Sequence, residues 1–405
     1  MRIGLVIEHF DPRRGGVEQW TAQFAARLIE RGHEVHVVAR SFSRSVTATR
    51  IVPHPVAEAP SRIDFAQAAR DILESLDLDV VHDTGYGWYC DVFQPHGGSR
   101  LAVAEQNLLL LPKWMRRLKR AISGLLPRYR QFDALTARQF ADDGRTVLAL
   151  SRRVAADFTR FHSIPSERTR LVYNGVDTER FHPDHRREYR HVVRDRLGIG
   201  RDELVFLIVA HNFKLKGVPT LLAALSDWRR QERHARLLVV GGKHARRYRW
   251  STWLKGLSPL VTFTGAVDDP VPYYAASDVY VQPTFYDPCS LVVLEALGCG
   301  LPVITTRLNG AGELVTEAKE GYLLSDPADA EELLSRMEMF FDADLRRRMG
   351  TAARALAEKH SFERNVRQVL AIYEEILAER RLDASGAQPV LPASTRFTGR
   401  VLASG

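Results

Sequence analysis

The chain has 405 residues, of which 45% are hydrophobic and 26% charged, and it carries a formal net charge of +8 at pH 7. This length predicts two or three domains, and the composition is typical of a soluble globular protein. Three scattered cysteines, Cys90, Cys289 and Cys299, exclude a disulfide framework or a zinc site and favour a reducing cytosol. The positive charge permits a polyanionic partner, which can be nucleic acid, anionic lipid or a phosphorylated substrate.

The N-terminal segment gives no sign of membrane targeting. Its apolar run is too short for a signal peptide and predicts a strand over residues 3–7 instead. No stretch approaches about eighteen consecutive apolar residues, so we expect no transmembrane helix.

Short apolar strands then alternate with helical patterns along the chain. The first series predicts strands at 3–7, 34–39, 80–82 and 146–150, with helices at about 17–31 and 65–75. This order is typical of βαβ units, which build a mostly parallel sheet. The pattern restarts after residue 200, with apolar, β-branched runs at 204–210, 236–240, 261–263, 279–282 and 303–305.

The two series predict an α/β protein with two doubly wound, Rossmann-like domains that face each other across a cleft. The Asn174-Gly175 turn marks the boundary and gives domains 1–175 and 176–361. A last helix over 362–380 is expected to close the first domain, and the Pro- and Ser-containing tail 383–405 is expected to be disordered. Ligands bind such folds beyond the carboxyl ends of the strands, so functional side chains are expected at that edge.

Three predicted turns bring glycine, lysine and histidine to that edge. Gly15-Gly16 lies between the first strand and the first helix, where glycines let a phosphate or a sugar approach helix amides; a plain flexible turn is the alternative. The pair is not a GxGxxG motif, so the sequence lacks the main feature that would indicate a dinucleotide-binding dehydrogenase. Lys214 and Lys216 follow a strand and can neutralise a diphosphate, unless they are ordinary solvated lysines. His96 lies in an irregular loop on the facing wall, although a lone histidine is more often structural.

The segment 284–306, TFYDPCSLVVLEALGCGLPVITT, carries two carboxylates eight residues apart. Asp287 falls in a loop after a strand, and Glu295 falls in an apolar helix that we expect Ser290 to cap. Burying an unpaired charge costs several kcal/mol, so Glu295 needs a partner, either a ligand or a protein group. A sugar nucleotide would offer hydroxyls and phosphates to the acids and to the first amides of the helix, which are expected to face the cleft: Cys289, Ser290 and Leu291.

This arrangement resembles the retaining glycosyltransferases of the GT-B fold, family 4. Their signature is an acid, seven residues, a Glu, a small-residue turn and a Pro-led strand, and it appears here as DPCSLVVLEALGCGLPVITT. The resemblance spans nearly the whole chain. It includes Gly15-Gly16, the His96 loop, NGVD at 174–177, the KLKG turn at 214–217, FTGAV at 263–267 and the acidic pair.

The resemblance implies a role for each matching residue. Glu295 would hold the nucleotide ribose and Asp287 the hydroxyls of the donor sugar. Lys216 would bind the diphosphate, and the loop from Gly265 to Val267 would flank the base. His96 would lie beside the sugar at the reacting carbon.

Two positions depart from the family pattern. The first acid is usually Glu, so the shorter Asp287 leaves the donor hexose open. The KLKG turn lacks the Arg that usually precedes its Lys by about five residues, and His211 and Lys214 are the candidates to replace it.

A DxD sequence, Asp77-Leu78-Asp79, binds a metal in another glycosyltransferase fold. Here it precedes the strand at 80–82, at the amino end and away from the expected cleft. We interpret it as a solvated connector and expect no metal and no other cofactor.

Residues 111–130 form a basic amphipathic segment without an acid. A basic face beside an apolar face with a Trp is typical of a helix in an anionic membrane interface. The alternative is a surface helix that packs Trp114 and Leu118 on its own domain, whereas nucleic acid is not expected because aromatics do not interleave with the charges. The candidate membrane-contact residues are Lys113, Trp114, Arg116, Arg117 and Arg120.

The runs 128–140 and 147–177 also resemble the branch of the family that glucosylates a heptose of the lipopolysaccharide core. The resemblance implies retaining transfer of a hexose, glucose favoured, from a nucleotide diphosphate sugar, UDP favoured, to a membrane-linked glycan. The protein would be cytoplasmic and bound peripherally to the inner membrane. The alternatives are transfer to another polysaccharide or glycolipid from GDP-mannose or UDP-GlcNAc, a GT-B sugar-nucleotide epimerase, or a non-catalytic binding protein.

Overall fold

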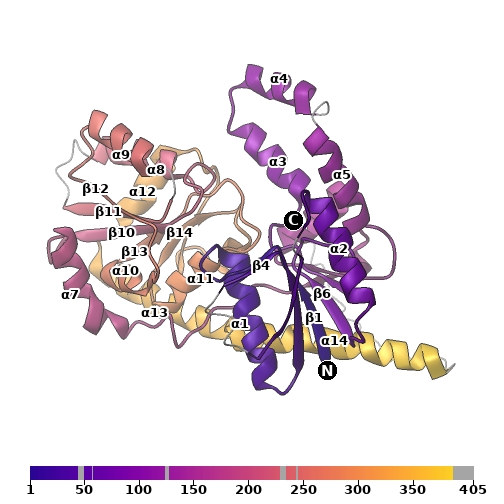
Figure 1. Ribbon diagram of the computed structural model, residues 1–405. Helices are drawn as coiled ribbons and strands as arrows, with labels where there is room; N and C mark the ends of the chain where they lie inside the picture. The colour runs from indigo at the N-terminus through magenta and orange to yellow at the C-terminus, as the bar shows by residue number, and fades with distance from the viewer. Residues whose placement is uncertain (44–49, 57, 124–126, 229–233, 243–244, 386–405) are drawn as a thin grey trace, which may run out of the picture.

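The computed structural model describes residues 1–43, 50–56, 58–123, 127–228, 234–242 and 245–385, and over these residues the chain forms two parallel sheets flanked by helices (Figure 1). The predicted disordered tail 383–405 starts three residues too early, because the last helix continues to Ser385, and from 386 onward it lies outside the described residues. Among the described helices, none is long and apolar enough to cross a bilayer. The predicted α/β fold with two Rossmann-like domains is confirmed.

The first sheet has seven parallel strands in the order β5-β3-β1-β6-β7-β8-β9. The direction of winding reverses between β1 and β6, the switch point beside which doubly wound sheets bind ligands. Leu5 of β1 lies opposite His82 of β6 at this point. The strands are β1 Arg2–Val6, β3 Glu34–Ala39, β5 Val52–Pro55, β6 Val80–Asp83, β7 Val92–Phe93, β8 Thr146–Ala149 and β9 Thr169–Leu171.

Six helices and a small two-stranded sheet complete the first domain. Three of the helices begin with side-chain caps, since Ser61 and Asp64 form a capping box and the hydroxyls of Ser99 and Ser151 accept from the backbone amides three residues on. The helices are α1 Gly16–Glu30, α2 Arg62–Glu74, α3 Arg100–Leu109, α4 Lys113–Ser123, α5 Pro127–Gln139 and α6 Arg152–His162, and the small sheet pairs β2 His9–Phe10 with β4 Ser41–Phe42.

The second sheet has six parallel strands in the order β12-β11-β10-β13-β14-β15, with its switch point between β10 and β13. The strands are β10 Leu204–Val209, β11 Ala235–Val240, β12 Val261–Gly265, β13 Val279–Val281, β14 Val303–Thr306 and β15 Gly321–Leu324. The helices are α7 His185–Leu197, α8 Val218–Trp228, α9 Ala245–Leu254, α10 Val271–Ala276, α11 Leu291–Gly298, α12 Ala330–Met339 and α13 Ala343–Lys359.

The central strand β10 shows why this sheet is covered on both faces. Its sequence, LVFLIV, is apolar throughout, as is typical of a parallel strand buried on both sides. Phe206 packs in a cluster with Leu221 of α8, whereas Leu207 packs in the opposite cluster with Leu294 of α11. The helix that carries Glu295 is therefore fixed against the underside of the sheet by its apolar residues.

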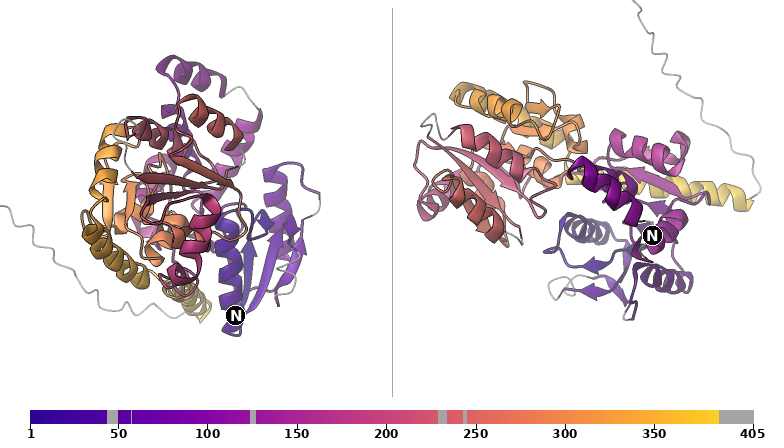
Figure 2. Two further views of the ribbon diagram at one scale, coloured as in Figure 1. Left: turned by 90° about the vertical axis from the view of Figure 1, so that its left-hand side faces the viewer. Right: turned by 90° about the horizontal axis from the view of Figure 1, so that it is seen from above.

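The last helix, α14 Phe362–Ser385, crosses back and packs on the first sheet (Figure 2). Val366 and Tyr373 join the core of Leu5, and the Tyr373 hydroxyl lies 2.5 Å from Nδ1 of His82. The two chain segments that link the domains run side by side, because the Val176 amide donates to the His360 carbonyl at 3.0 Å. The chain therefore passes between the two domains twice at the same place.

Candidate active site

Lys216 and Asp287 meet at the switch point of the second sheet. Lys216 lies in the turn after β10 and Asp287 in the loop after β13, and the Lys216 ammonium forms an ion pair with Oδ2 of Asp287. The Gln282 amide nitrogen lies 3.4 Å from the same oxygen. Asp287 is only 8% exposed and Lys216 is half-buried, so this is a partly buried, prearranged charge pair at the ligand-binding edge of the sheet.

Gly217 allows the lysine turn to lie against the acidic loop. Its φ of +81° is in the left-handed region, and a Cβ at this position would lie 2.0 Å from the Pro283 carbonyl oxygen. Only glycine fits both the backbone conformation and the close approach. The KLKG turn is therefore built to bring Lys216 to the loop of Asp287.

The start of α11 differs from what the sequence predicts. Ser290 occupies the N-cap position, but its hydroxyl makes no capping bond and instead lies 3.1 Å from Oε1 of Gln282. Its amide donates to Oδ1 of Asn309 at 3.2 Å. Ser290 therefore takes the predicted N-cap position without the predicted capping bond. Its amide, expected to be offered to a ligand in the cleft, is paired, because two buried polar side chains outside the motif, Gln282 and Asn309, bond to this residue.

Glu295 is buried in α11 and has a protein partner. The Tyr274 hydroxyl donates to Oε2 of Glu295 at 2.8 Å. Burial raises the pKa of Glu295 to about 7, while the Tyr274 hydrogen bond and the charge of Arg180 oppose the increase. One hydrogen bond does not satisfy a carboxylate, which has four lone-pair positions, so Glu295 keeps capacity for a ligand.

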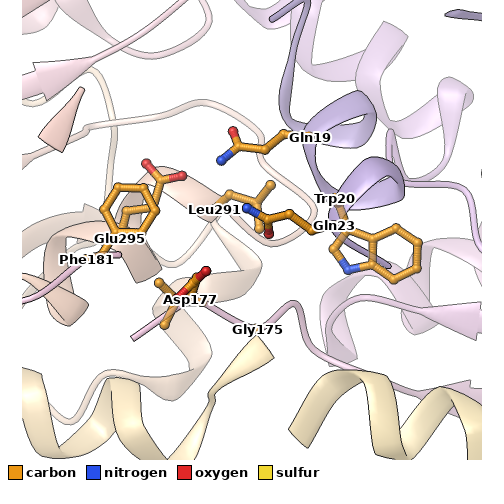
Figure 3. A pocket seen from close by; sticks show the side chains of 9 residues that line it. Gln19, Trp20, Gln23, Gly175, Asp177, Phe181, Leu291 and Glu295 are labelled. Atoms are coloured by element: carbon orange, nitrogen blue, oxygen red, sulfur yellow. The ribbon is translucent and has the colours of Figure 1, made fainter. Parts of the chain in front are cut away.

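Glu295 also lines a small recess at the border of the two domains (Figure 3). Figure 3 shows the amide groups of Gln19 and Gln23 pointing from α1 toward Leu291 and Glu295. The recess has a volume of about 10 Å³, which is room for about one water molecule. Its lining is Gln19, Trp20, Gln23, Gly175, Val176, Asp177, Phe181, Leu291 and Glu295.

The Gly15-Gly16 turn lies against the second domain. Gly15 is extended, with φ of 179°, so no special backbone freedom is needed there. A Cβ on Gly16 would lie 3.1 Å from Cδ1 of Leu291, and Leu291 packs on the core of the first domain. The amino ends of α1 and α11 therefore face each other across the border, and Gly16 permits their approach.

His96 lies behind the recess rather than in its wall. Its ring centroid is 4.5 Å from that of Trp20, which lines the recess. Burial and the neighbouring His82 lower the pKa of His96 to about 3, so the imidazole is neutral at pH 7. Its Nε2 is buried and has no hydrogen-bond partner among the described residues.

The other residues implied by the resemblance lie around the same edge of the second sheet. Lys214 is exposed, and Gly265 has φ of +79° with open space where a Cβ would stand. Val267 packs half-buried on the second domain's core. Cys289 is buried, and its carbonyl accepts from the Asn174 side-chain amide at 2.8 Å, which ties the link between the domains to the acidic loop.

The DxD sequence lies at the opposite, amino edge of the first sheet. Oδ2 of Asp79 accepts from the Arg2 backbone amide at 2.6 Å, and Asp77 accepts from the Arg2 guanidinium at 2.9 Å. The Asp77 side chain is fully exposed. Both carboxylates thus join the amino ends of β1 and β6, at the edge opposite the carboxyl ends where ligands bind.

The basic helix α4 extends away from the first domain beyond α3 (Figure 1). Trp114 is 69% and Leu118 54% exposed, so these side chains do not pack on their own domain. Arg117 is exposed, but Arg116 is half-buried and donates to the carbonyls of Leu111 and Leu109 at 2.7 and 2.8 Å. Arg116 therefore caps the end of α3. The side chains of two further candidates lie outside the described residues: Lys113 and Arg120.

Sequence reasoning missed Glu313, which joins the two domains. It lies in the 3-10 helix η3 Gly310–Leu314, and its carboxylate accepts from the amides of Arg152 and Arg153 at 2.9 and 2.8 Å. The Tyr173 hydroxyl donates to it at 2.7 Å. A carboxylate from the second domain thus supplements the N-terminus of α6 in the first, a contact that no local sequence pattern announces.

Two facing Rossmann-like domains, with paired charged groups at the switch point and a recess at their border, define a glycosyltransferase of the GT-B type. The chain carries the group 1/family 4 form of this fold. Residues 14–180 match the model of Glycosyltransferase Family 4, and residues 203–342 match that of Glycosyl transferases group 1.

Named relatives fall in more than one branch. The chain is 26% identical to a D-inositol 3-phosphate glycosyltransferase of Acidothermus cellulolyticus, over 95% of this chain and 92% of that protein. It is 28% identical to the lipopolysaccharide glucosyltransferase WaaG of Escherichia coli, over 52% of this chain and 56% of that protein.

The crystal structure of WaaG, a glycosyltransferase involved in lipopolysaccharide biosynthesis, superposes with a TM-score of 0.76 at 22% identity. The superposition covers 92% of this chain and 99% of that one. At this level of identity the likeness concerns the fold, so the donor and the acceptor are matters for proposal.

Proposed function

We propose that the protein transfers glucose from UDP-glucose to a membrane-linked, phosphorylated glycan such as the lipopolysaccharide core, with retention of the anomeric configuration. The observation that carries this proposal is the site itself. A lysine–aspartate pair lies at the switch point, and a second, buried carboxylate lies within the next helix. Such a set offers a cation for the diphosphate and acceptors for the hydroxyls of both sugars of the donor.

The donor extends along the amino end of α11 in this proposal. Glu295 accepts from the ribose hydroxyls, and Asp287 accepts from the hexose through Oδ1, because both of its protein contacts fall on Oδ2. The Lys216 ammonium turns from Asp287 to the diphosphate. It stabilises the negative charge that develops there as the bond between the anomeric carbon and the phosphate oxygen breaks.

The acceptor hydroxyl attacks from the face that the diphosphate leaves, and its proton passes to the departing phosphate oxygen. A glycosidase-like double displacement would need a carboxylate nucleophile close to the sugar. The rings that contact or act on His96, which is expected beside the reacting carbon, are those of Trp20 and His82, and neither residue is a carboxylate. This favours direct, single-face transfer without a covalent intermediate.

A membrane-linked acceptor follows from the surface of α4. Trp114, Met115 and Leu118 are large apolar side chains exposed on this helix, and basic residues lie beside them. Trp is favoured at membrane interfaces, and each basic residue near an anionic surface contributes about 1 kcal/mol. The protein would therefore bind peripherally to the cytoplasmic face of the inner membrane.

A thermal-shift screen against UDP-, GDP- and ADP-sugars tests the donor. The correct donor raises the unfolding temperature because it binds only the native state. Radiolabel transfer from UDP-glucose to a lipid-extractable lipopolysaccharide core, with the product's anomeric configuration read by NMR, tests the reaction. Stabilisation by GDP-mannose alone would overturn the donor, and label found only in an isomerised sugar nucleotide without acceptor would identify an epimerase.

A second acceptor class has support from one relative. The match to a D-inositol 3-phosphate glycosyltransferase extends over 95% of this chain, whereas the match to WaaG covers 52%. A small phosphorylated polyol is therefore the second candidate acceptor. Label that stays in the aqueous phase with inositol 3-phosphate, and does not enter lipid, would favour it.

A further inference from the structure

Helix α9 of the second domain exposes three large apolar side chains on one face. Trp250 and Trp253 are each 61% exposed and Leu254 is 63% exposed. The two indole rings lie with centroids 4.9 Å apart at an interplanar angle of 30°. A contiguous group of this kind on a surface marks an interaction site rather than scattered surface residues.

Two side chains of α9 anchor the helix to its domain. Tyr248 packs against Phe213 with ring centroids 5.2 Å apart, and the Arg249 guanidinium donates to the Phe263 carbonyl at 2.7 Å. Phe213 immediately precedes the lysine turn of the candidate donor site. The indoles are therefore held by a fixed helix that packs directly against that turn.

The chain segment that carries the exposed indoles holds only positive charge. No Asp or Glu occurs between Glu232 and Asp268, while seven Lys and Arg residues do. Arg246 and Arg247 are exposed on the same side of α9 as the indoles, as their spacing of three and four residues requires. An apolar aromatic group bordered by arginines matches an anionic lipid surface, where indoles lie at the headgroup level and arginines meet phosphates.

The placement of α9 agrees with this chemistry. Figures 1 and 2 show α4 on the first domain and α9 on the second at the same end of the molecule. Both helices expose Trp beside basic residues at that end, and they belong to different domains. A bilayer at that end of the molecule would lie near both helices.

A second copy of the chain fits the α9 face less well. A two-fold dimer through this face would bring the same patch from each subunit together. Arg246 and Arg247 would then meet their own copies without an acid on α9 to neutralise them. Lipid headgroups supply that missing negative charge.

We propose that α9 is a second membrane anchor, so that both domains of the protein contact an anionic bilayer. This inference extends the proposed function, which assigns membrane contact to α4 alone, and it rests on that function for the identity of the surface. The lysine turn behind α9 would then lie close to the membrane that holds the acceptor.

Vesicle sedimentation with equal parts of phosphatidylglycerol and phosphatidylcholine tests α9. Trp250→Ser with Trp253→Ser is expected to weaken binding about tenfold or more, and Arg246→Glu with Arg247→Glu by a similar factor. Val192→Ser on α7 removes an apolar side chain that is 64% exposed in the same domain and is expected to change nothing. Brominated lipid is expected to quench less fluorescence in the double Trp variant.

Separate variants distinguish membrane contact through α4 from membrane contact through α9. Trp114→Ser with Arg117→Glu tests α4, and both pairs are compared at equal unfolding temperature and equal donor hydrolysis. Loss of vesicle binding in the α4 variant alone would overturn the second anchor and leave the proposed function standing. Loss of vesicle binding in the α9 variant alone would keep the α9 anchor and overturn the membrane contact that the proposed function assigns to α4. If the α9 Trp variant instead removed a dimer in sedimentation velocity and kept full vesicle binding, the patch would be a self-interface and the inference would fail.

Discussion

Glu295→Gln offers the sharpest test of the site, because the buried carboxylate should leave a signature in the pH dependence of stability. The pKa of Glu295 is raised from 4.5 to about 7 in the folded protein. A raised carboxyl pKa favours folding below the unfolded value and loses that contribution as pH rises through the folded value. The shift corresponds to about 3 kcal/mol, which is absent in the Gln variant.

The measurement is urea unfolding of wild type and Glu295→Gln between pH 4.5 and pH 8. The variant is expected to gain stability relative to wild type as pH rises, by about 3 kcal/mol across this range. Gln has the same shape and can still accept from the Tyr274 hydroxyl, so the comparison isolates the charge. A difference between the two proteins that stays constant with pH would refute the buried, ionisable state of Glu295.

The same variant tests the ribose assignment. Hydrogen bonds to a charged group contribute about 1.5–3 kcal/mol, so calorimetry should show UDP binding weakened by about 10- to 150-fold near pH 8. Wild-type affinity should rise with pH through about 7, since the ionised acid is the better acceptor. 2′,3′-Dideoxy-UDP lacks the hydroxyls and should bind both proteins alike; equal loss for both nucleotides would place Glu295 elsewhere in the site.

Three further predictions concern the lysine turn, the metal and the border between the domains. Gly217→Ala should cost several kcal/mol in urea unfolding and abolish turnover, because its Cβ meets the Pro283 carbonyl, whereas Gly265→Ala at a similar φ has open space and should cost only about 1–2 kcal/mol; equal losses would contradict the packing argument. Transfer activity should persist in excess EDTA, and loss restored only by Mn²⁺ or Mg²⁺ would return attention to Asp77 and Asp79. Glu313→Ala should leave the α6 amides without a carboxylate and increase the radius of gyration in small-angle scattering, while an unchanged radius would show that the contact does not hold the domains together.

The parts of the fold that follow from sequence are those with strong local patterns. The continuous apolar run of β10 and the amphipathic pattern of α1 predict their elements to within about two residues. Strands that depend on pairing escaped prediction. β5, with the sequence VPHP, contains two prolines, and β7 has only two residues, so their neighbours in the sheet define them rather than their composition.

The same distinction holds in the site. Motifs whose spacing resembles that of a known family contain Lys216, Asp287 and Glu295. The sequence therefore predicted that these residues lie at one edge of one sheet. Gln282 and Asn309 carry no such motif, yet they bond to the loop of Asp287 and the start of α11. A polar residue that directly follows a buried apolar strand, as Gln282 follows β13, is the signal that could have found one of them.

The closed border of the domains connects the site to the proposed membrane surface. A nucleotide sugar needs a site of about 300–1,000 Å³, whereas the recess beside Glu295 has about 10 Å³. In the proposed function, donor entry would therefore require α1 and α11 to separate, and the paired links at Val176 and His360 are the place where the two domains would turn. Helices α4 and α9 belong to different domains, so a bilayer that bound both would constrain the rotation of one domain relative to the other. The angle of the two helices to the bilayer would decide whether this constraint opposes or favours the separation of α1 from α11. Membrane attachment would then act on donor exchange as well as on access to the acceptor.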